Sequence, residues 1–115
     1  MIRKAQELTP DYREKMRDGE GIVELTSFVT PEELNNKGRL FAKIKLNPGC
    51  GIGYHVHEAD AEVFYMIAGT AEYSDNGEIK TVTAGDVMIC PTGTGHSICN
   101  KTDAPAELIA VIVNA

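Results

Sequence analysis

Two of the three histidines in this chain are separated by a single residue, as His55 and His57. In an extended strand, residues i and i+2 project from the same face, with their Cα atoms roughly 6.5 Å apart. Two imidazoles at this spacing can reach one ion through metal–nitrogen bonds of about 2.1 Å. The spacing therefore predicts a pair of side chains that chelate a metal.

One carboxylate and the remaining histidine extend this site. Glu62 follows the second histidine after four residues, which is long enough for the chain to turn and bring the carboxylate back. Glu58 and Asp60 are rival carboxylates with less weight, because they have the character of a solvated turn. His96 is expected at the start of a later strand. Three imidazoles and one carboxylate suit Fe(II), Mn(II), Ni(II), Zn(II), Co(II) or Cu(II) better than Ca²⁺.

Short strands separated by turn residues are the elements that must position these side chains. Alternating apolar residues over 40–46 predict a half-buried strand. Asn76-Gly77 predicts a tight hairpin turn, because both residues accept positive φ. An apolar run over 106–113, interrupted only by Glu107, predicts a strand that is buried on both faces. Further strands are expected over 62–68, 87–90 and 96–100. About eight strands with little helix predict an all-β sandwich or barrel.

The first part of the chain carries two helix signals. Thr9 and Pro10 could cap and begin a short helix, although the same stretch could form an extended arm. Thr30, a following proline and Glu33 form a capping-box pattern. This pattern predicts a short helix near 31–36.

The composition is that of one globular domain, with 115 residues of which 43% are apolar and 24% are charged. We expect residues 1–38 to pack as a segment on a barrel of residues 39–115. Acidic residues outnumber basic ones by 17 to 11, so the net charge is −6. Because binding to nucleic acid or anionic lipid requires clustered basic residues, neither partner is expected.

Three cysteines, Cys50, Cys90 and Cys99, have no Cys-x-x-Cys spacing and an odd count. We expect them to be reduced thiols, with thiolate ligation or a reactive Cys50 beside its glycines as the alternative. The N-terminus lacks the apolar region of a secretion signal, and the chain lacks a run of about 18 apolar residues. These features predict a cytoplasmic protein that does not span a membrane.

Ten residues form two spaced motifs with 15 residues between them: Gly49, His55, His57, Glu62 and Gly69, then Gly85, Pro91, Gly93, His96 and Asn100. The motifs resemble those of the cupin superfamily at every fixed position, over roughly residues 39–114. The resemblance is to small, single-domain, conserved-barrel cupins. It implies a double-stranded β-helix, which is a jelly-roll barrel, and a homodimer. It also implies one divalent transition metal bound by His55, His57, Glu62 and His96.

Alternation along the strands predicts which side chains join the metal ligands inside the barrel. Phe64 and Met66 share the parity of Glu62, and Ile98 shares the parity of His96. These three apolar residues are expected either to form a pocket wall or to belong to the core. Pro91 and Gly93 are expected to shape the loop before His96.

The function indicated by the sequence is a small metalloenzyme that acts on a small oxygen-bearing molecule. Similar small cupins include dioxygenases, decarboxylases and isomerases. Arg39 is the nearest basic residue, but its parity favours a position at an edge or interface. The only candidates for a general acid or base are Tyr73 and Glu62, the latter if it is released from the metal. The alternatives are a non-catalytic binding or sensing module with a metal in the barrel, and a purely structural metal.

Overall fold

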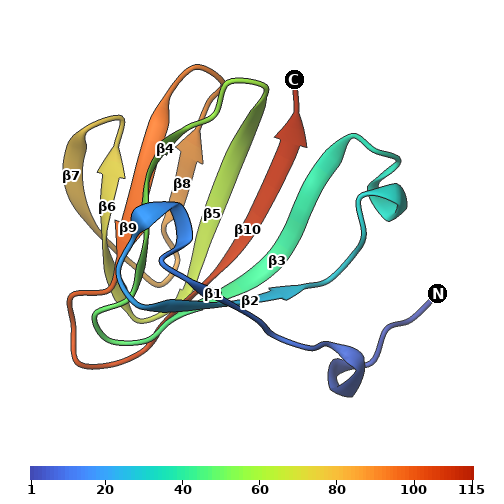
Figure 1. The fold of residues 1–115 in the computed structure, drawn as a ribbon, viewed down its shortest axis with the longest axis horizontal. Coiled ribbons are helices and arrows are strands. Elements are labelled where there is room, and N and C mark those ends of the chain that lie inside the picture. Colours follow the sequence, from blue (N-terminus) through green and yellow to red (C-terminus); the bar gives the residue numbers. More distant parts are fainter.

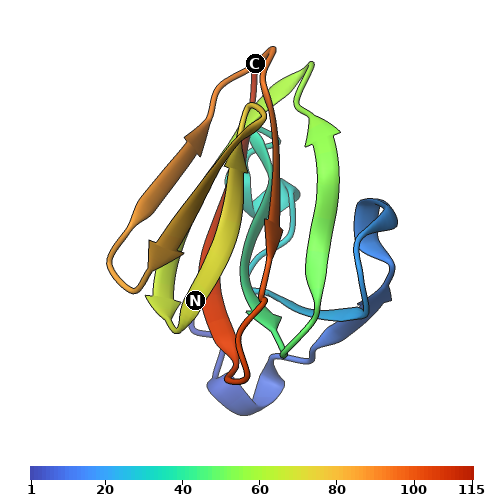
Figure 2. The same ribbon diagram turned by 90° about the vertical axis from the view of Figure 1, so that its left-hand side faces the viewer.

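Two antiparallel β-sheets face each other in the computed structural model, which describes residues 1–115 (Figures 1 and 2). The first sheet has the strand order β1-β2-β3-β10-β5-β8, with bounds Asp11–Glu14, Ile22–Ser27, Gly38–Leu46, Ala106–Asn114, Asp60–Ala68 and Val87–Cys90. The second has the order β4-β9-β6-β7, with bounds Gly51–Val56, Gly95–Cys99, Thr70–Asp75 and Glu78–Thr83. The all-β jelly-roll prediction is confirmed.

Three short 3₁₀ helices lie in the connections, with bounds Ala5–Glu7 (η1), Met16–Asp18 (η2) and Glu32–Leu34 (η3). No helix has the length and apolar character needed to cross a bilayer. The hairpin between β6 and β7 turns at the predicted place, where Asn76 and Gly77 have φ angles of 52° and 98°.

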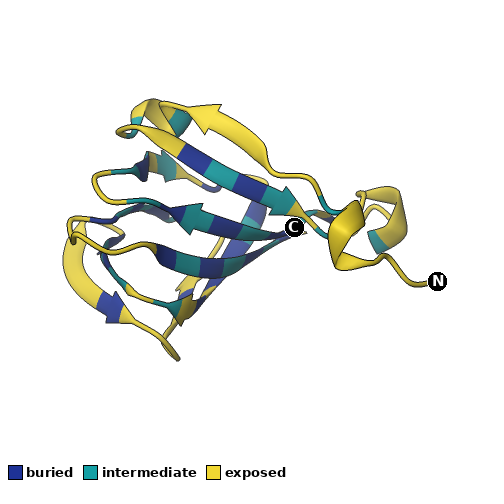
Figure 3. Cartoon of the chain, turned by 90° about the horizontal axis from the view of Figure 1, so that it is seen from below, coloured by how far each residue is buried: buried dark blue, intermediate teal, exposed yellow.

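The core lies between the two sheets and is built from alternate residues of the strands. In β5, Phe64 and Met66 are buried whereas Tyr65 and Ile67 are exposed, as alternation predicts. Figure 3 shows the same alternation as bands of buried and less buried residues along the strands. The buried apolar cluster contains 16 residues drawn from both sheets. One apolar face of each sheet is therefore removed from water.

Strand β10 corrects one prediction. Leu108 and Ala110 are fully buried, whereas Ile109 and Val111 are only partly buried. The apolar run was predicted to be buried on both faces, but it alternates between buried and partly buried positions. The reason is that only one face of the six-stranded sheet packs against the second sheet.

The predicted capping box of Thr30 and Glu33 is present, but the helix that it begins is shorter than predicted. The backbone N–H of Thr30 donates to the Glu33 carboxylate at 2.8 Å, and the N–H of Glu33 donates to the Thr30 hydroxyl at 3.3 Å. This capping box begins a single 3₁₀ turn instead of a helix over 31–36. Asn35 and Asn36 end the turn, because both adopt left-handed φ angles of 56° and 55°.

The segment that follows Thr9 and Pro10 forms β1 and η2 instead of a regular helix. Lys15, Arg17 and Asp18 in and beside η2 all have left-handed φ angles, of 51°, 54° and 63°. Such backbone strain persists only where the surrounding structure holds it. Here η2 lies directly on β4, where a Cβ on Gly53 would collide with the carbonyl oxygen of Arg17. Because Gly53 has no side chain, η2 can pack closely against β4.

Candidate metal centre

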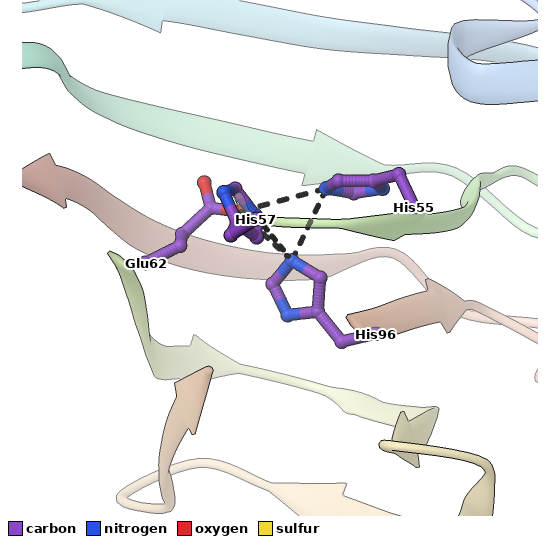
Figure 4. Close-up of side chains that lie close together, drawn as sticks. All are labelled: His55, His57, Glu62 and His96. Atoms are coloured by element: carbon purple, nitrogen blue, oxygen red, sulfur yellow. Dashed lines mark hydrogen bonds and ion pairs between the residues drawn. The ribbon is translucent and has the colours of Figure 1, made fainter. Parts of the chain in front are cut away.

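The four side chains predicted to bind a metal converge in the structure (Figure 4). His55 lies in β4, His57 follows β4 directly, Glu62 lies in β5 and His96 lies in β9. Antiparallel pairing of β4 with β9 places His55 opposite His96. One potential ligand atom from each residue lies within 4.8 Å of the other three. The cluster joins strands from both sheets.

The distances between the potential ligand atoms fit a shared ion. The Nε2 atom of His96 lies 3.1 Å from Nε2 of His57 and 3.2 Å from Nε2 of His55. Oε1 of Glu62 lies 2.9 Å, 3.1 Å and 3.9 Å from Nε2 of His96, His57 and His55. Atoms that share one ion at about 2.1 Å lie roughly 3.0–3.4 Å apart at adjacent positions. The cluster therefore has the donors and the spacing that a divalent transition metal requires.

Each imidazole also uses its outer nitrogen, Nδ1, in a hydrogen bond. Nδ1 of His55 lies 2.8 Å from the Gly53 carbonyl, Nδ1 of His57 lies 2.6 Å from Asp60 Oδ1, and Nδ1 of His96 lies 2.9 Å from the Tyr73 hydroxyl. A carbonyl or a carboxylate can only accept, so His55 and His57 carry their proton on Nδ1. Their Nε2 lone pairs are then directed into the cluster, which is the arrangement of metal-ligating histidines.

The electrostatics of the site favour the binding of a cation by these side chains. Burial would raise the pKa of Glu62, but hydrogen bonds and charge from the surrounding imidazoles lower it to about 2. Burial lowers the pKa of His96, although the neighbouring Glu62 carboxylate opposes this shift. Phe64 stacks on the His96 ring at 4.9 Å between centroids. At neutral pH the site therefore offers an ionised carboxylate and a neutral imidazole.

The two rival carboxylates lie outside the four-residue cluster. Glu58 is exposed. Asp60 is buried and bridges His57 and Arg39, with its Oδ2 accepting from the Arg39 guanidinium at 2.7 Å. Burial would raise the pKa of Asp60, but these two hydrogen bonds lower it. Asp60 thus remains ionised and orients His57 through Nδ1, the ring nitrogen that is not directed into the cluster. The spacing in the sequence did not indicate this role.

Replacing Asp60 with asparagine should weaken metal binding by about 10- to 100-fold, because the charge that supports the His57 imidazole is lost. Titration of the apoprotein in competition with a chelator measures this effect. Glu58→Gln is the matched control. Glu58 is exposed and lies two residues before Asp60, so this variant removes the same charge outside the buried site. Unchanged affinity in the Asp60→Asn protein would contradict this role.

A pocket of about 150 Å³ opens onto the cluster. Its lining consists of Arg13, Met16, Arg17, Leu25, Arg39, Leu40, Ile44, Ile52, His55, His57, Glu62 and Ile112. Phe64, Met66 and Ile98 lie in the core cluster and not in this lining. The apolar wall comes instead from β2, β3, β4 and β10.

Arg39 lines the pocket, although its parity along β3 favoured an edge or an interface. The pairing of β3 with β10 explains the difference: Leu40 faces Ile112 and Gly38 faces Val113, so Arg39 is an extra residue without a partner. An unpaired residue of this kind is a β-bulge, which redirects a side chain relative to the rest of the strand. The alternation rule therefore fails at this position.

Comparison with known proteins agrees with the fold and with the four-residue cluster. The model of the family described as "Cupin domain" matches residues 42–112. An oxalate-binding protein from Thermotoga maritima is 39% identical over 113 residues, which cover 98% of this chain and 93% of the relative. A crystal structure described as a predicted oxalate decarboxylase, also from Thermotoga maritima, covers 100% of both chains with a TM-score of 0.96 and 38% identity.

A more distant structure, from Thermus thermophilus, shares the fold alone, with a TM-score of 0.74 and 21% identity over 98% of this chain and 96% of that one. The family match spans both motifs and all four residues of the cluster. With its jelly-roll fold and this match over more than half of its length, the chain belongs to the cupin family.

Proposed function

We propose that the protein binds a small dicarboxylate of the oxalate type through one divalent transition metal held by His55, His57, Glu62 and His96. The observation that carries this proposal is the pocket of about 150 Å³ that opens onto three of the four donor residues, His55, His57 and Glu62. Pockets for drug-sized ligands usually enclose about 300–1,000 Å³, so this one suits a much smaller molecule. The 39% identical relative that is named an oxalate-binding protein supports the choice of ligand.

A divalent ion at this site would supply a Lewis-acid centre for the oxygen atoms of a carboxylate. The protein would contribute the rest of the site. The apolar side chains of Leu40, Ile44 and Ile52 limit water around the bound ligand. In such surroundings, electrostatic attraction between the ligand and the centre is stronger than in bulk water.

Binding without turnover is better supported than catalysis, because the pocket has no free proton donor or acceptor. Apart from the metal-binding candidates His55, His57 and Glu62, its only ionisable residues are arginines, which stay protonated. Tyr73, the other candidate acid, is buried behind His96, and burial raises its pKa. General acid–base chemistry requires a titrating group within reach of the ligand.

Decarboxylation of the same ligand is the second candidate. The structure described as a predicted oxalate decarboxylase favours it, since that protein is 38% identical over the full length of both chains. Both candidates use the same metal and the same pocket. They differ only in whether the ligand leaves the site unchanged.

The test begins with untagged protein, whose metal content per chain is measured by inductively coupled plasma mass spectrometry. We expect about one equivalent of one transition metal per chain, and heat of oxalate binding in calorimetry that disappears after treatment with EDTA. Prolonged incubation with oxalate, followed by assays for formate and carbon dioxide, separates binding from decarboxylation. Metal-loaded protein that fails to bind oxalate would overturn the proposal.

A further inference from the structure

Arginine is concentrated at the mouth of the metal pocket. The chain has four arginines, and three of them, Arg13, Arg17 and Arg39, line this pocket. None of the seven lysines does so, and Glu62 is the only acidic residue in the lining. The protein as a whole has a net charge of −6. A cationic mouth on an acidic protein attracts and concentrates anions at the pocket.

Three separate elements bring these arginines together. Arg13 lies in β1, Arg17 lies in η2, and Arg39 is the bulged residue of β3. Figure 2 shows the segment between β1 and β2 beside β4, where η2 lies on the strand just before His55. Partly buried Met16 packs against the core and holds η2 in place. The arginines thus stand at the entrance to the metal cluster.

The guanidinium groups retain donors that the protein does not use. Arg13 donates only its Nε, to Asp11 at 2.7 Å. Arg39 donates only its Nε, to Asp60 at 2.7 Å. The Arg17 side chain has no hydrogen bond or ion pair with the protein, although it lines the pocket. The planar guanidinium presents paired N–H groups that match the two oxygens of a carboxylate, which makes arginine more selective than lysine.

We propose that Arg13, Arg17 and Arg39 form an anion subsite that binds a second carboxylate of the ligand. The subsite makes the protein selective for dicarboxylates over monocarboxylates of similar size, and Arg17 supplies its principal free donors. This inference rests on the proposed function, because it assumes that the other end of the ligand meets the metal. It adds a selectivity that the metal alone does not provide.

Oxalate and glycolate are the probes that separate the two ends of the ligand. Both can present one carboxylate to a metal, but glycolate carries a neutral hydroxyl in place of the second carboxylate of oxalate. In calorimetry with metal-loaded protein, the Arg17→Gln and Arg13→Gln variants should bind oxalate at least about tenfold more weakly, the scale of a lost hydrogen bond between charged groups. Their affinity for glycolate should change by less than about threefold, the low end of that range.

Lys15→Gln is the matched control, since Lys15 is a cation of the same segment that does not line the pocket. It should bind oxalate as the wild type does, and all variants should keep their metal content. Equal weakening for oxalate and glycolate, no weakening at all, or an equal effect of Lys15→Gln would overturn the subsite alone. A metal-loaded wild type that binds neither probe would overturn the proposed function together with the subsite.

Discussion

Replacing either His57 or Glu62 with alanine should leave the purified protein with less than about a tenth of the wild-type metal content. Each residue contributes an atom to the four-donor cluster, and both are buried. Loss of a residue that merely supports a ligand already costs about 10- to 100-fold in affinity, so loss of a ligand itself should cost at least about 100-fold. Mass spectrometry of the metal, expressed per chain, gives the result directly.

The control for these variants is Glu58→Ala. Glu58 is exposed and directly follows His57, so its replacement removes a charge next to the site without removing a donor. Circular dichroism of all three variants confirms that each has folded. If Glu58→Ala lost as much metal as Glu62→Ala, the assignment of the carboxylate ligand would be wrong.

Replacing Asn100 with alanine should lower the free energy of unfolding by about 3 kcal/mol, the upper end for a buried group that loses its partner. Asn100 is fully buried, and its amide joins the end of β3 to the loop that follows β9. Its nitrogen donates to the carbonyls of Leu46 and Ala104 at 2.8 Å and 2.7 Å. Its oxygen accepts from the backbone N–H and the hydroxyl of Thr102 at 2.9 Å and 2.7 Å. Alanine removes these four hydrogen bonds. The Thr102 hydroxyl still donates to the Ala104 carbonyl at 3.0 Å, but the contacts to the Leu46 carbonyl and the Thr102 N–H are lost.

Urea unfolding of the metal-free proteins measures this loss, because bound metal would itself stabilise the folded state. Asn114→Ala is the matched control: Asn114 is exposed and makes a single side-chain hydrogen bond, to the carbonyl of Asn36 at 2.9 Å. Its replacement should cost less than about 1 kcal/mol. Similar losses in the two variants would show that the Asn100 network does not stabilise the junction.

The convergence of His55, His57 and Glu62 could be predicted because it depends on local rules. Alternation places two histidines on one face, and a short turn returns the carboxylate to them. The approach of His96 depends on the pairing of β4 with β9, about 40 residues apart in sequence. Only the family motif indicated that pairing. The side chain of Asn100 closes a turn as its type suggests, but its bond to Leu46 also depends on distant strands.

The arginines at the mouth could not be predicted, for two physical reasons. Arg39 escapes the alternation rule because of a bulge, and the position of this bulge is set by the pairing of β3 with β10, which lies far away in the sequence. Arg17 reaches the pocket through left-handed backbone that its own residue type disfavours. The end of η3 was more accessible to prediction. Asn35 and Asn36 are residues that tolerate left-handed φ, so the pair could have been read as an earlier stop.

Gly53 contacts two functional parts of the protein at once. Its carbonyl accepts the hydrogen bond that orients His55, and its Cα faces the carbonyl of Arg17 so closely that no side chain fits. Any related sequence with a larger residue here must therefore carry its N-terminal segment along a different path. The arginine-bearing entrance therefore depends on glycine at position 53, because a larger residue would displace η2, and Arg17 with it, from the mouth of the pocket.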